Sequence, residues 1–203
     1  MAASAQEVKK AQKASKRAAA TVLVVGDSLS AEYGLKRGTG WVALLQARLA
    51  QRHVNATLVN ASISGDTTAG GRSRLPNLLA THKPTLVILE LGGNDALRGL
   101  PLDVTRANLA AMTRAAKESG AKVLIVGMQV PPNYGRQYAE QLSTLFGAVA
   151  KSQGAALVPF LLKGVADGPR ADAMFQADRI HPKEAAHPIM LDNVWPVLEP
   201  LLR

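Results

Sequence analysis

Apolar residues along the chain gather into five short runs, separated by longer stretches in which apolar and polar positions follow a helical period. The runs are rich in Val, Ile and Leu and show little polar alternation. Runs of this kind are typical of strands covered on both faces, as in a parallel sheet. The predicted strands cover residues 21–25, 56–61, 85–91, 122–128 and 155–160.

The stretches between these runs carry the start and stop signals of helices. A helix is predicted to begin near Trp41, after the glycine-rich turn at residues 38–40. Asp103 is predicted to be the N-cap of a second helix that runs to Ser119 and stops at Gly120.

Two further helices are predicted in the last third of the chain. One ends at Gly154, and its buried face follows the i, i+3, i+4, i+7 spacing at Leu142, Leu145, Phe146 and Val149. The other begins near Pro188 and is expected to kink at Pro196.

Strand and helix thus alternate along most of the chain, which favours a doubly wound α/β fold. The prediction is a three-layer α/β/α sandwich around a five-stranded parallel sheet. Functional sites in such sheets lie beyond the carboxyl ends of the strands. Any chemistry should therefore appear in the segments that directly follow the predicted strands.

Composition and charge along the chain indicate its domain organisation. The chain has 203 residues and a formal net charge of +9. Residues 1–20 carry few large apolar side chains and are predicted to be a basic, flexible extension, with residues 21–203 as a single domain. The basic charge is interpreted as solvated surface charge, and no nucleic-acid partner is predicted. The cations of the extension are Lys9, Lys10, Lys13, Lys16 and Arg17.

Localisation depends on what precedes the printed sequence. No run approaches the length of a membrane-spanning helix, so no integral membrane segment is predicted. Residues 3–5 (Ala-Ser-Ala) have the small-x-small form of a signal-peptidase site. The protein is periplasmic or secreted if a signal is removed before Gln6, and otherwise cytoplasmic; chance similarity in an alanine-rich segment is the alternative.

Small and polar residues follow the predicted strands at the expected places. They lie at residues 26–28, 62–67, 92–95 and 178–182. Hydrolysis through an acyl intermediate needs a nucleophile, a base and donors for the oxyanion. Ser28 can be the nucleophile and His181 the base, with Asp178 as the carboxylate that orients the imidazole.

Donors for an oxyanion are available on the same segments. They are the backbone N–H groups of Ser28 and Gly65 and the side-chain amide of Asn94. Taken singly, each residue has an ordinary alternative: a helix-capping or turn serine, a turn glycine and a turn asparagine. Asp27 is interpreted as a brace of the loop through local hydrogen bonds.

Four motifs carry a resemblance to a known family. "GDSLS" (26–30), "NASISGDT" (60–67), "LGGND" (91–95) and "DRIHP" (178–182) resemble the signature blocks of the GDSL, or SGNH, hydrolases, in the family's order. The resemblance covers residues 21–203 and is strongest to the bacterial thioesterase I, protease I and lysophospholipase (arylesterase) group. It implies a flavodoxin-like sandwich, the SGNH hydrolase fold. It also implies the roles given above for Ser28, Gly65, Asn94, Asp178 and His181, and no metal or cofactor.

Other histidines and the lack of cysteine argue against a metal site. The chain has no cysteine and only four histidines, without a zinc-binding spacing. His187, which precedes Pro188, is expected to cap the last helix or lie on its surface.

The substrate site is less defined by the sequence. Leu75 and Pro76, and Pro131, Pro132 and Tyr134 in the loop at 130–135, are predicted to line an acyl groove, with ordinary loop packing as the alternative. The predicted function is hydrolysis of aryl and alkyl esters, fatty acyl-CoA and lysophospholipid by a monomer acting on small molecules. A carbohydrate O-acetyl esterase on the same scaffold is one alternative, and a non-catalytic basic binding domain is another.

Overall fold

The computed structural model describes residues 19–130 and 132–203. The predicted N-terminal extension up to residue 18 and the candidate cleavage site at residues 3–5 lie outside the described residues. Within the described ranges, no helix is long and apolar enough to cross a membrane.

A five-stranded parallel sheet forms the centre of the molecule, as predicted, in the order β2-β1-β3-β4-β5. The chain moves from β1 to β2 on one side and then returns past β1 to β3. The switch point of the sheet therefore lies between β1 and β3, where α/β folds bind their ligands. The strands are β1 (Ala20–Gly26), β2 (Ala56–Asn60), β3 (Leu86–Glu90), β4 (Lys122–Val126) and β5 (Ala156–Val158). The first strand begins one residue before the predicted domain boundary, because Ala20 already pairs with Ala56.

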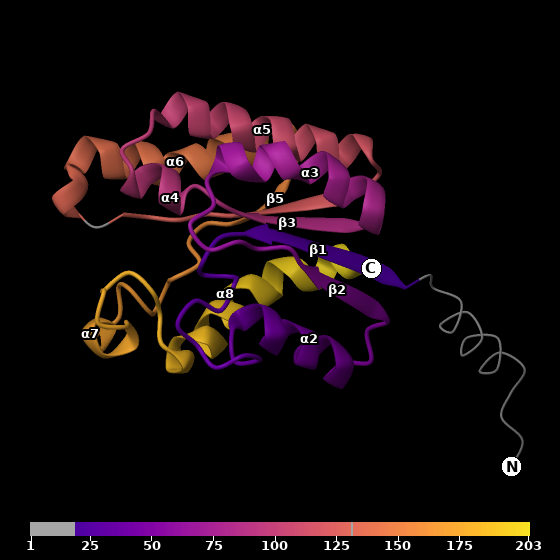
Figure 1. Ribbon diagram of the computed structural model, residues 1–203, viewed down its shortest axis with the longest axis horizontal. Helices are drawn as coiled ribbons and strands as arrows, with labels where there is room; N and C mark the ends of the chain where they lie inside the picture. The colour runs from indigo at the N-terminus through magenta and orange to yellow at the C-terminus, as the bar shows by residue number, and fades with distance from the viewer. Residues whose placement is uncertain (1–18, 131) are drawn as a thin grey trace, which may run out of the picture.

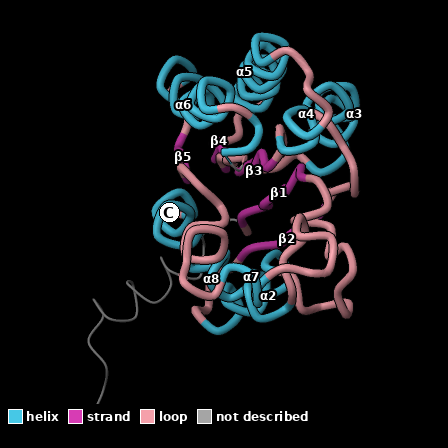
Figure 2. Tube along the Cα trace, turned by 90° about the vertical axis from the view of Figure 1, so that its left-hand side faces the viewer, coloured by secondary structure: helices cyan, strands magenta, loops and turns pink. Residues whose placement is uncertain are grey.

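Helices cover both faces of the sheet and complete the three layers (Figures 1 and 2). One face carries α3 (Thr68–His82), α4 (Gly93–Leu97), α5 (Leu102–Glu118) and α6 (Arg136–Gln153). The other face carries α2 (Trp41–Gln51) and α8 (His187–Leu198), which pack against each other. Short elements complete the chain: η1 (Pro132–Tyr134), α7 (Ala171–Met174), η2 (Glu184–Ala186) and η3 (Glu199–Leu202).

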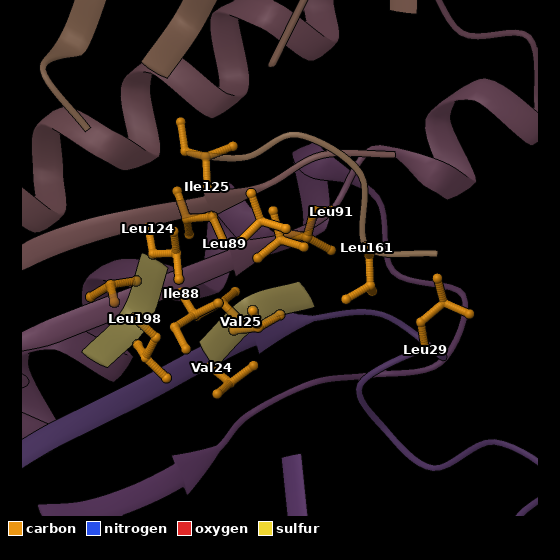
Figure 3. Packing of buried hydrophobic residues seen from close by; sticks show 14 of the residues in the cluster. Val24, Val25, Leu29, Ile88, Leu89, Leu91, Leu124, Ile125, Leu161 and Leu198 are labelled. Carbon is orange, nitrogen blue, oxygen red and sulfur yellow. The ribbon is translucent and has the colours of Figure 1, made fainter. Parts of the chain in front are cut away.

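The core is built on the two central strands. Residues 22–25 of β1 and 86–89 of β3 are almost fully buried, because helices cover both faces. Their side chains interlock with those of β4 and with Leu198 of α8 (Figure 3). Full burial of a Val, Leu or Ile side chain stabilises the fold by about 1.5–3 kcal/mol. These strands therefore provide the rigid base from which the segments after them project.

Most predicted helix boundaries are confirmed, and one cap is wrong. The helix α2 begins at Trp41, as predicted. The helix α6 ends before Gly154, and this glycine takes the left-handed conformation (φ 59°). The helix α8 begins at His187 and contains Pro196. Asp103, however, is not an N-cap. The extended backbone of Pro101 (φ −58°, ψ 128°) sets the start of α5, so Asp103 lies inside the first turn, where its charge complements the helix dipole.

The helix α3 was missed because its sequence lacks a clear apolar period and contains Gly70, Gly71 and Pro76. The side chain of Thr67 caps it by accepting a hydrogen bond from the N–H of Gly70 at 3.3 Å. A Cβ at Gly71 would overlap the side chain of Leu91. The glycine therefore lets α3 pack closely against the end of β3.

We expect Gly127→Ala to lower the free energy of unfolding by about 1–3 kcal/mol, because overpacking forces the backbone to shift. A Cβ at Gly127 would overlap the carbonyl oxygen of Pro159, which belongs to the backbone and cannot rotate away. Urea unfolding followed by circular dichroism measures the change.

Gly147→Ala is the matched control, since its Cβ would meet only Leu157 Cδ2 at an ordinary 3.7 Å. It lies inside α6, where alanine stabilises a helix by roughly 0.5–1 kcal/mol over glycine. Equal urea midpoints for Gly127→Ala and Gly147→Ala would contradict the close approach of Gly127, just after β4, to Pro159, just after β5.

Candidate active site

The polar segments predicted to carry chemistry meet at the carboxyl edge of the sheet. Ser28 follows β1, Gly65 lies in the loop after β2, and Asn94 lies in α4 just after β3. His181 and Asp178 lie on the long segment between α7 and α8. Because all five strands are parallel, their carboxyl ends share one edge, near α4 and α7 in Figure 1.

The turn after β1 carries Ser28, and the next helix along the chain is α2, which begins at Trp41. Asp27 accepts a hydrogen bond from the N–H of Leu29 on its Oδ1 atom at 3.0 Å, the local brace predicted from the sequence. Its carbonyl oxygen also accepts from the N–H groups of Ser30 and Ala31. This set of short-range bonds fixes the turn on either side of Ser28.

His181 connects Ser28 to Asp178 through hydrogen bonds at both ring nitrogens. Its Nε2 atom lies 2.9 Å from Ser28 Oγ, and its Nδ1 atom lies 2.7 Å from Asp178 Oδ2. An ionised Asp178 only accepts, so Nδ1 carries the proton and Nε2 is free to accept from the serine hydroxyl. The three groups thus form an oriented chain from carboxylate to hydroxyl.

The surroundings of Asp178 favour its ionised form. Its Oδ1 atom accepts from the backbone N–H groups of Ile180 (2.9 Å) and His181 (3.0 Å). Desolvation raises the pKa of Asp178, but these two bonds and the side chain of His181 outweigh it and lower the pKa to about 2. Arg179, which lies between Asp178 and His181 in this loop, takes a positive φ of 58°.

The three groups predicted as oxyanion donors lie in the segments that follow β1, β2 and β3. Among the described residues, neither the N–H of Ser28 nor that of Gly65 donates to a protein acceptor. Gly65 has a φ of +79°, in the left-handed region that favours glycine, and its carbonyl accepts from Arg98 Nη2 at 2.8 Å. The Asn94 Nδ2 atom donates to Asp27 Oδ2 at 3.0 Å, which leaves its second N–H for another acceptor.

A groove of about 910 Å³ opens beside Ser28, Asn94 and His181. Tyr134, one of the residues predicted to line an acyl groove, borders this groove and is 38% exposed. Most of the other lining side chains are apolar. Val130 belongs to the loop at 130–135 named from the sequence, whereas several others were not anticipated: Leu97, Met128, Phe160, Leu162, Phe175 and Ile180.

Two of the predicted groove residues are elsewhere. Leu75 and Pro76 lie within α3, which already begins at Thr68 and carries them away from the strand ends. Leu75 is 1% exposed and belongs to the core, while Pro76 is on the solvent side of the helix. The prediction that they line the groove is therefore wrong. Pro131 and the side chain of Pro132 lie outside the described part of the chain.

His187 is buried, contrary to the surface position considered from the sequence. Its Nδ1 atom accepts from the N–H of Trp41, the first residue of α2, at 3.0 Å. His187 therefore caps α2, although it is itself the first residue of α8. Burial lowers the pKa of His187. Across residues 19–130 and 132–203, no three His, Cys, Asp or Glu side chains group closely enough to hold a metal ion.

Sequence reasoning missed two side chains next to the site. Tyr33 stacks on His181 with ring centroids 4.3 Å apart, and Glu90 is fully buried at the end of β3, close to Asp27. Burial raises the pKa of Glu90 well above its usual range and that of Asp27 to about 6. A signal for Glu90 did exist, since it is a lone carboxyl group at the end of an apolar strand.

Known proteins resemble this chain along most of its length. The model of the GDSL-like lipase/acylhydrolase family matches residues 24–189. Esterase TesA of Pseudomonas aeruginosa is 57% identical over 185 residues, which cover 91% of this chain and 90% of that protein. Thioesterase 1/protease 1/lysophospholipase L1 of Escherichia coli K12 is 40% identical over 91% of this chain and 86% of its own. A crystal structure of TesA superimposes with a TM-score of 0.86 at 56% identity, covering 89% of this chain and 99% of that one.

Leu75 lies in the core and Leu97 lines the groove, so the same substitution at each residue compares the two positions. We expect Leu75→Ala to lower the free energy of unfolding by about 2–5 kcal/mol, as buried leucine truncations do. Leu97→Ala removes the same atoms from a side chain that is 39% exposed, and should cost less than about 1 kcal/mol. Urea unfolding of both variants is the measurement; a similar loss in each would contradict the assignment of Leu75 to the core.

Proposed function

The chain belongs to the GDSL-like lipase/acylhydrolase family and is a carboxylic ester hydrolase, and we propose that it works through an acyl intermediate on Ser28. The observation that carries the proposal is the hydrogen-bonded chain from Asp178 through His181 to Ser28, with distances of 2.7 and 2.9 Å. A serine, a histidine and a carboxylate in this order form the arrangement that activates a hydroxyl for acyl transfer.

In the first half of the reaction Ser28 attacks the substrate. Its Oγ atom bonds to the carbonyl carbon while His181 Nε2 takes the hydroxyl proton. The ionised Asp178 stabilises the imidazolium that results, since a carboxylate with a pKa of about 2 does not take up the proton near neutral pH. The C–O or C–S bond then breaks, and His181 returns the proton to the leaving alcohol or thiol.

The carbonyl oxygen becomes negative during the attack and needs fixed donors. The N–H groups of Ser28 and Gly65 and the free amide N–H of Asn94 supply them. Donors that are already in place stabilise this charge without a cost of reorganisation. In the second half of the reaction a water molecule, activated by His181, attacks the acyl group in the same way and releases the acid.

The groove supports acyl esters and thioesters as substrates. Its lining is largely apolar, which suits an alkyl or aryl acyl group lying beside the reacting carbonyl. The named relatives are an esterase and a thioesterase with lysophospholipase activity in its name. We assign aryl and alkyl esters, fatty acyl-CoA and lysophospholipid to this chain as its substrate class.

A single copy of the chain contains every group that these steps require. Ser28, Gly65, Asn94, Asp178 and His181 all come from the same sheet edge. No residue from a second copy enters the proposed reaction. We therefore propose that the monomer is the active form.

Ser28→Ala should lower kcat by more than about 10³-fold, because removal of the nucleophile disables the whole triad. Hydrolysis of p-nitrophenyl butyrate measures the rate, and circular dichroism verifies the fold. Ser73→Ala, on the exposed side of α3, is the matched control and should retain full activity. Near-normal turnover by Ser28→Ala would rule out the acyl-serine mechanism.

The apolar groove should favour longer acyl chains over acetyl. Each methylene that leaves water contributes up to about 0.8 kcal/mol, so two added methylenes should raise kcat/KM by roughly tenfold. A series of p-nitrophenyl esters from acetate to octanoate, followed by acyl-CoA and lysophospholipid, measures this preference. Activity confined to acetyl esters would instead indicate the O-acetyl esterase alternative.

A further inference from the structure

The carboxyl groups of Glu90 and Asp27 form a buried pair beside the turn that carries Ser28, and the hydrolysis proposed above uses neither. Glu90 is the last residue of β3 and is 0% exposed, while Asp27 is 2% exposed. Glu90 Oε2 accepts from Ser30 Oγ at 2.7 Å and from the N–H of Asp27 at 3.4 Å. A Cβ at Gly26 would lie 2.9 Å from the same oxygen, so the carboxyl group sits directly against the turn.

The surroundings of the two carboxyl groups decide which one holds a proton. Two carboxylates that lie together out of water do not both ionise near neutral pH. Asp27 receives full hydrogen bonds from the N–H of Leu29 and from Asn94 Nδ2, both at 3.0 Å. Glu90 Oε1 has no such donor among the described residues. The proton therefore lies on Glu90, and Asp27 is the ionised member of the pair.

The charge on Asp27 controls how the amide of Asn94 is oriented. An ionised carboxylate only accepts hydrogen bonds, so the nitrogen of the amide must face it. The second N–H on that nitrogen is then available to the substrate. A protonated Asp27 can donate to the amide oxygen instead, which allows the Asn94 amide to turn over and present its oxygen to the site.

We propose that Glu90 and Asp27 are positioning residues for ester hydrolysis. Glu90 holds the proton of the pair, and Asp27 remains an acceptor-only carboxylate that keeps the Asn94 N–H directed at the oxyanion. The inference rests on the proposed function of Ser28 and Asn94, and it adds two residues that act through Asn94 without touching the substrate carbonyl.

The role of Asp27 is expected to depend on pH. The charged and titratable groups nearest to it are Glu90 from β3 and His181 from the loop before α8, and Arg74 of α3 reaches the carbonyl of Gly26 at 3.4 Å. Burial raises the pKa of Asp27 to about 6. Its contribution to kcat is therefore complete well above pH 6 and is lost as the pH falls below that value, when Asp27 gains a proton.

Asp27→Asn tests the orientation of the amide. At pH 8 we expect kcat to fall by about 10- to 100-fold with little change in KM, less than the roughly 10²–10³ expected when an oxyanion donor is removed. The ratio of wild-type to Asp27→Asn kcat should decrease steadily toward one as the pH falls further below 6. A ratio that does not change with pH would overturn the proposal.

Glu90→Gln tests where the proton lies. The glutamine amide has the shape of a protonated Glu90, can donate to Asp27 and can accept from Ser30, so kcat at pH 8 should remain near the wild-type value. A loss as large as that of Asp27→Asn would overturn the proposal. The infrared carbonyl band of a protonated acid should be present at pH 8 in the wild type and absent from Glu90→Gln. This band decides the question even if Asp27→Asn does not fold, since its absence from the wild type contradicts a protonated Glu90.

A double variant separates positioning from a general structural role. If Asp27 acts through Asn94, adding Asp27→Asn to Asn94→Ala should cause almost no further loss of kcat, whereas independent effects would multiply. Asp103→Asn, the same change on the exposed start of α5, should leave kcat unaltered. If Ser28→Ala stays active, the proposed function itself fails; if it is inactive while Asp27→Asn is normal, only this inference fails.

Discussion

The pairing of β1 with β3 is the constraint on which the site depends. Helices cover both faces of these two strands, and the buried side chains of the strands fix their register. In this parallel register Gly26 lies opposite Glu90. The chain can continue from both strands only at their shared carboxyl edge. For this reason the turn with Ser28 and the short helix with Asn94 lie next to each other, although 66 positions separate them in the sequence. A shift of one residue in this register would turn each strand's side chains to the opposite face.

The site shows how the surroundings give two aspartates different properties. Asp178 lies on a partly exposed loop and accepts backbone hydrogen bonds, which keep its pKa at about 2. Asp27 lies under the sheet edge beside a second carboxyl group, and burial raises its pKa to about 6. The same side chain is thus a permanent anion in one place and a group that titrates near neutrality in the other. Such separation of pKa values by environment is how enzymes assign roles to chemically identical groups.

The proposed reacting groups and the groove walls come from different parts of the chain. The turn with Ser28 and the amide of Asn94 follow central strands with almost fully buried side chains. The groove walls come mainly from the segments after β4 and β5, including the short elements η1 and α7. Precise placement matters most for the reacting groups, because a small displacement of an oxyanion donor costs much of its effect. The acyl-binding surface needs only apolar contact, which loop segments can supply.

The sequence by itself determined the five strands, the helices α2, α5, α6 and α8, the single parallel sheet and the family. It also determined which polar segments meet, because strand-end residues of a parallel sheet must share one edge, and Ser28, Asn94 and His181 are near neighbours there. Local patterns did not reveal α3, whose glycines and proline conceal a helix held by its contact with the sheet; for that reason Leu75 and Pro76 were misplaced. Only the tertiary structure decided that Glu90 lies against Asp27, that Tyr33 stacks on His181 and that His187 caps α2. These contacts join residues far apart in the chain, and their energies depend on burial and on the direction of hydrogen bonds, which no short stretch of sequence specifies.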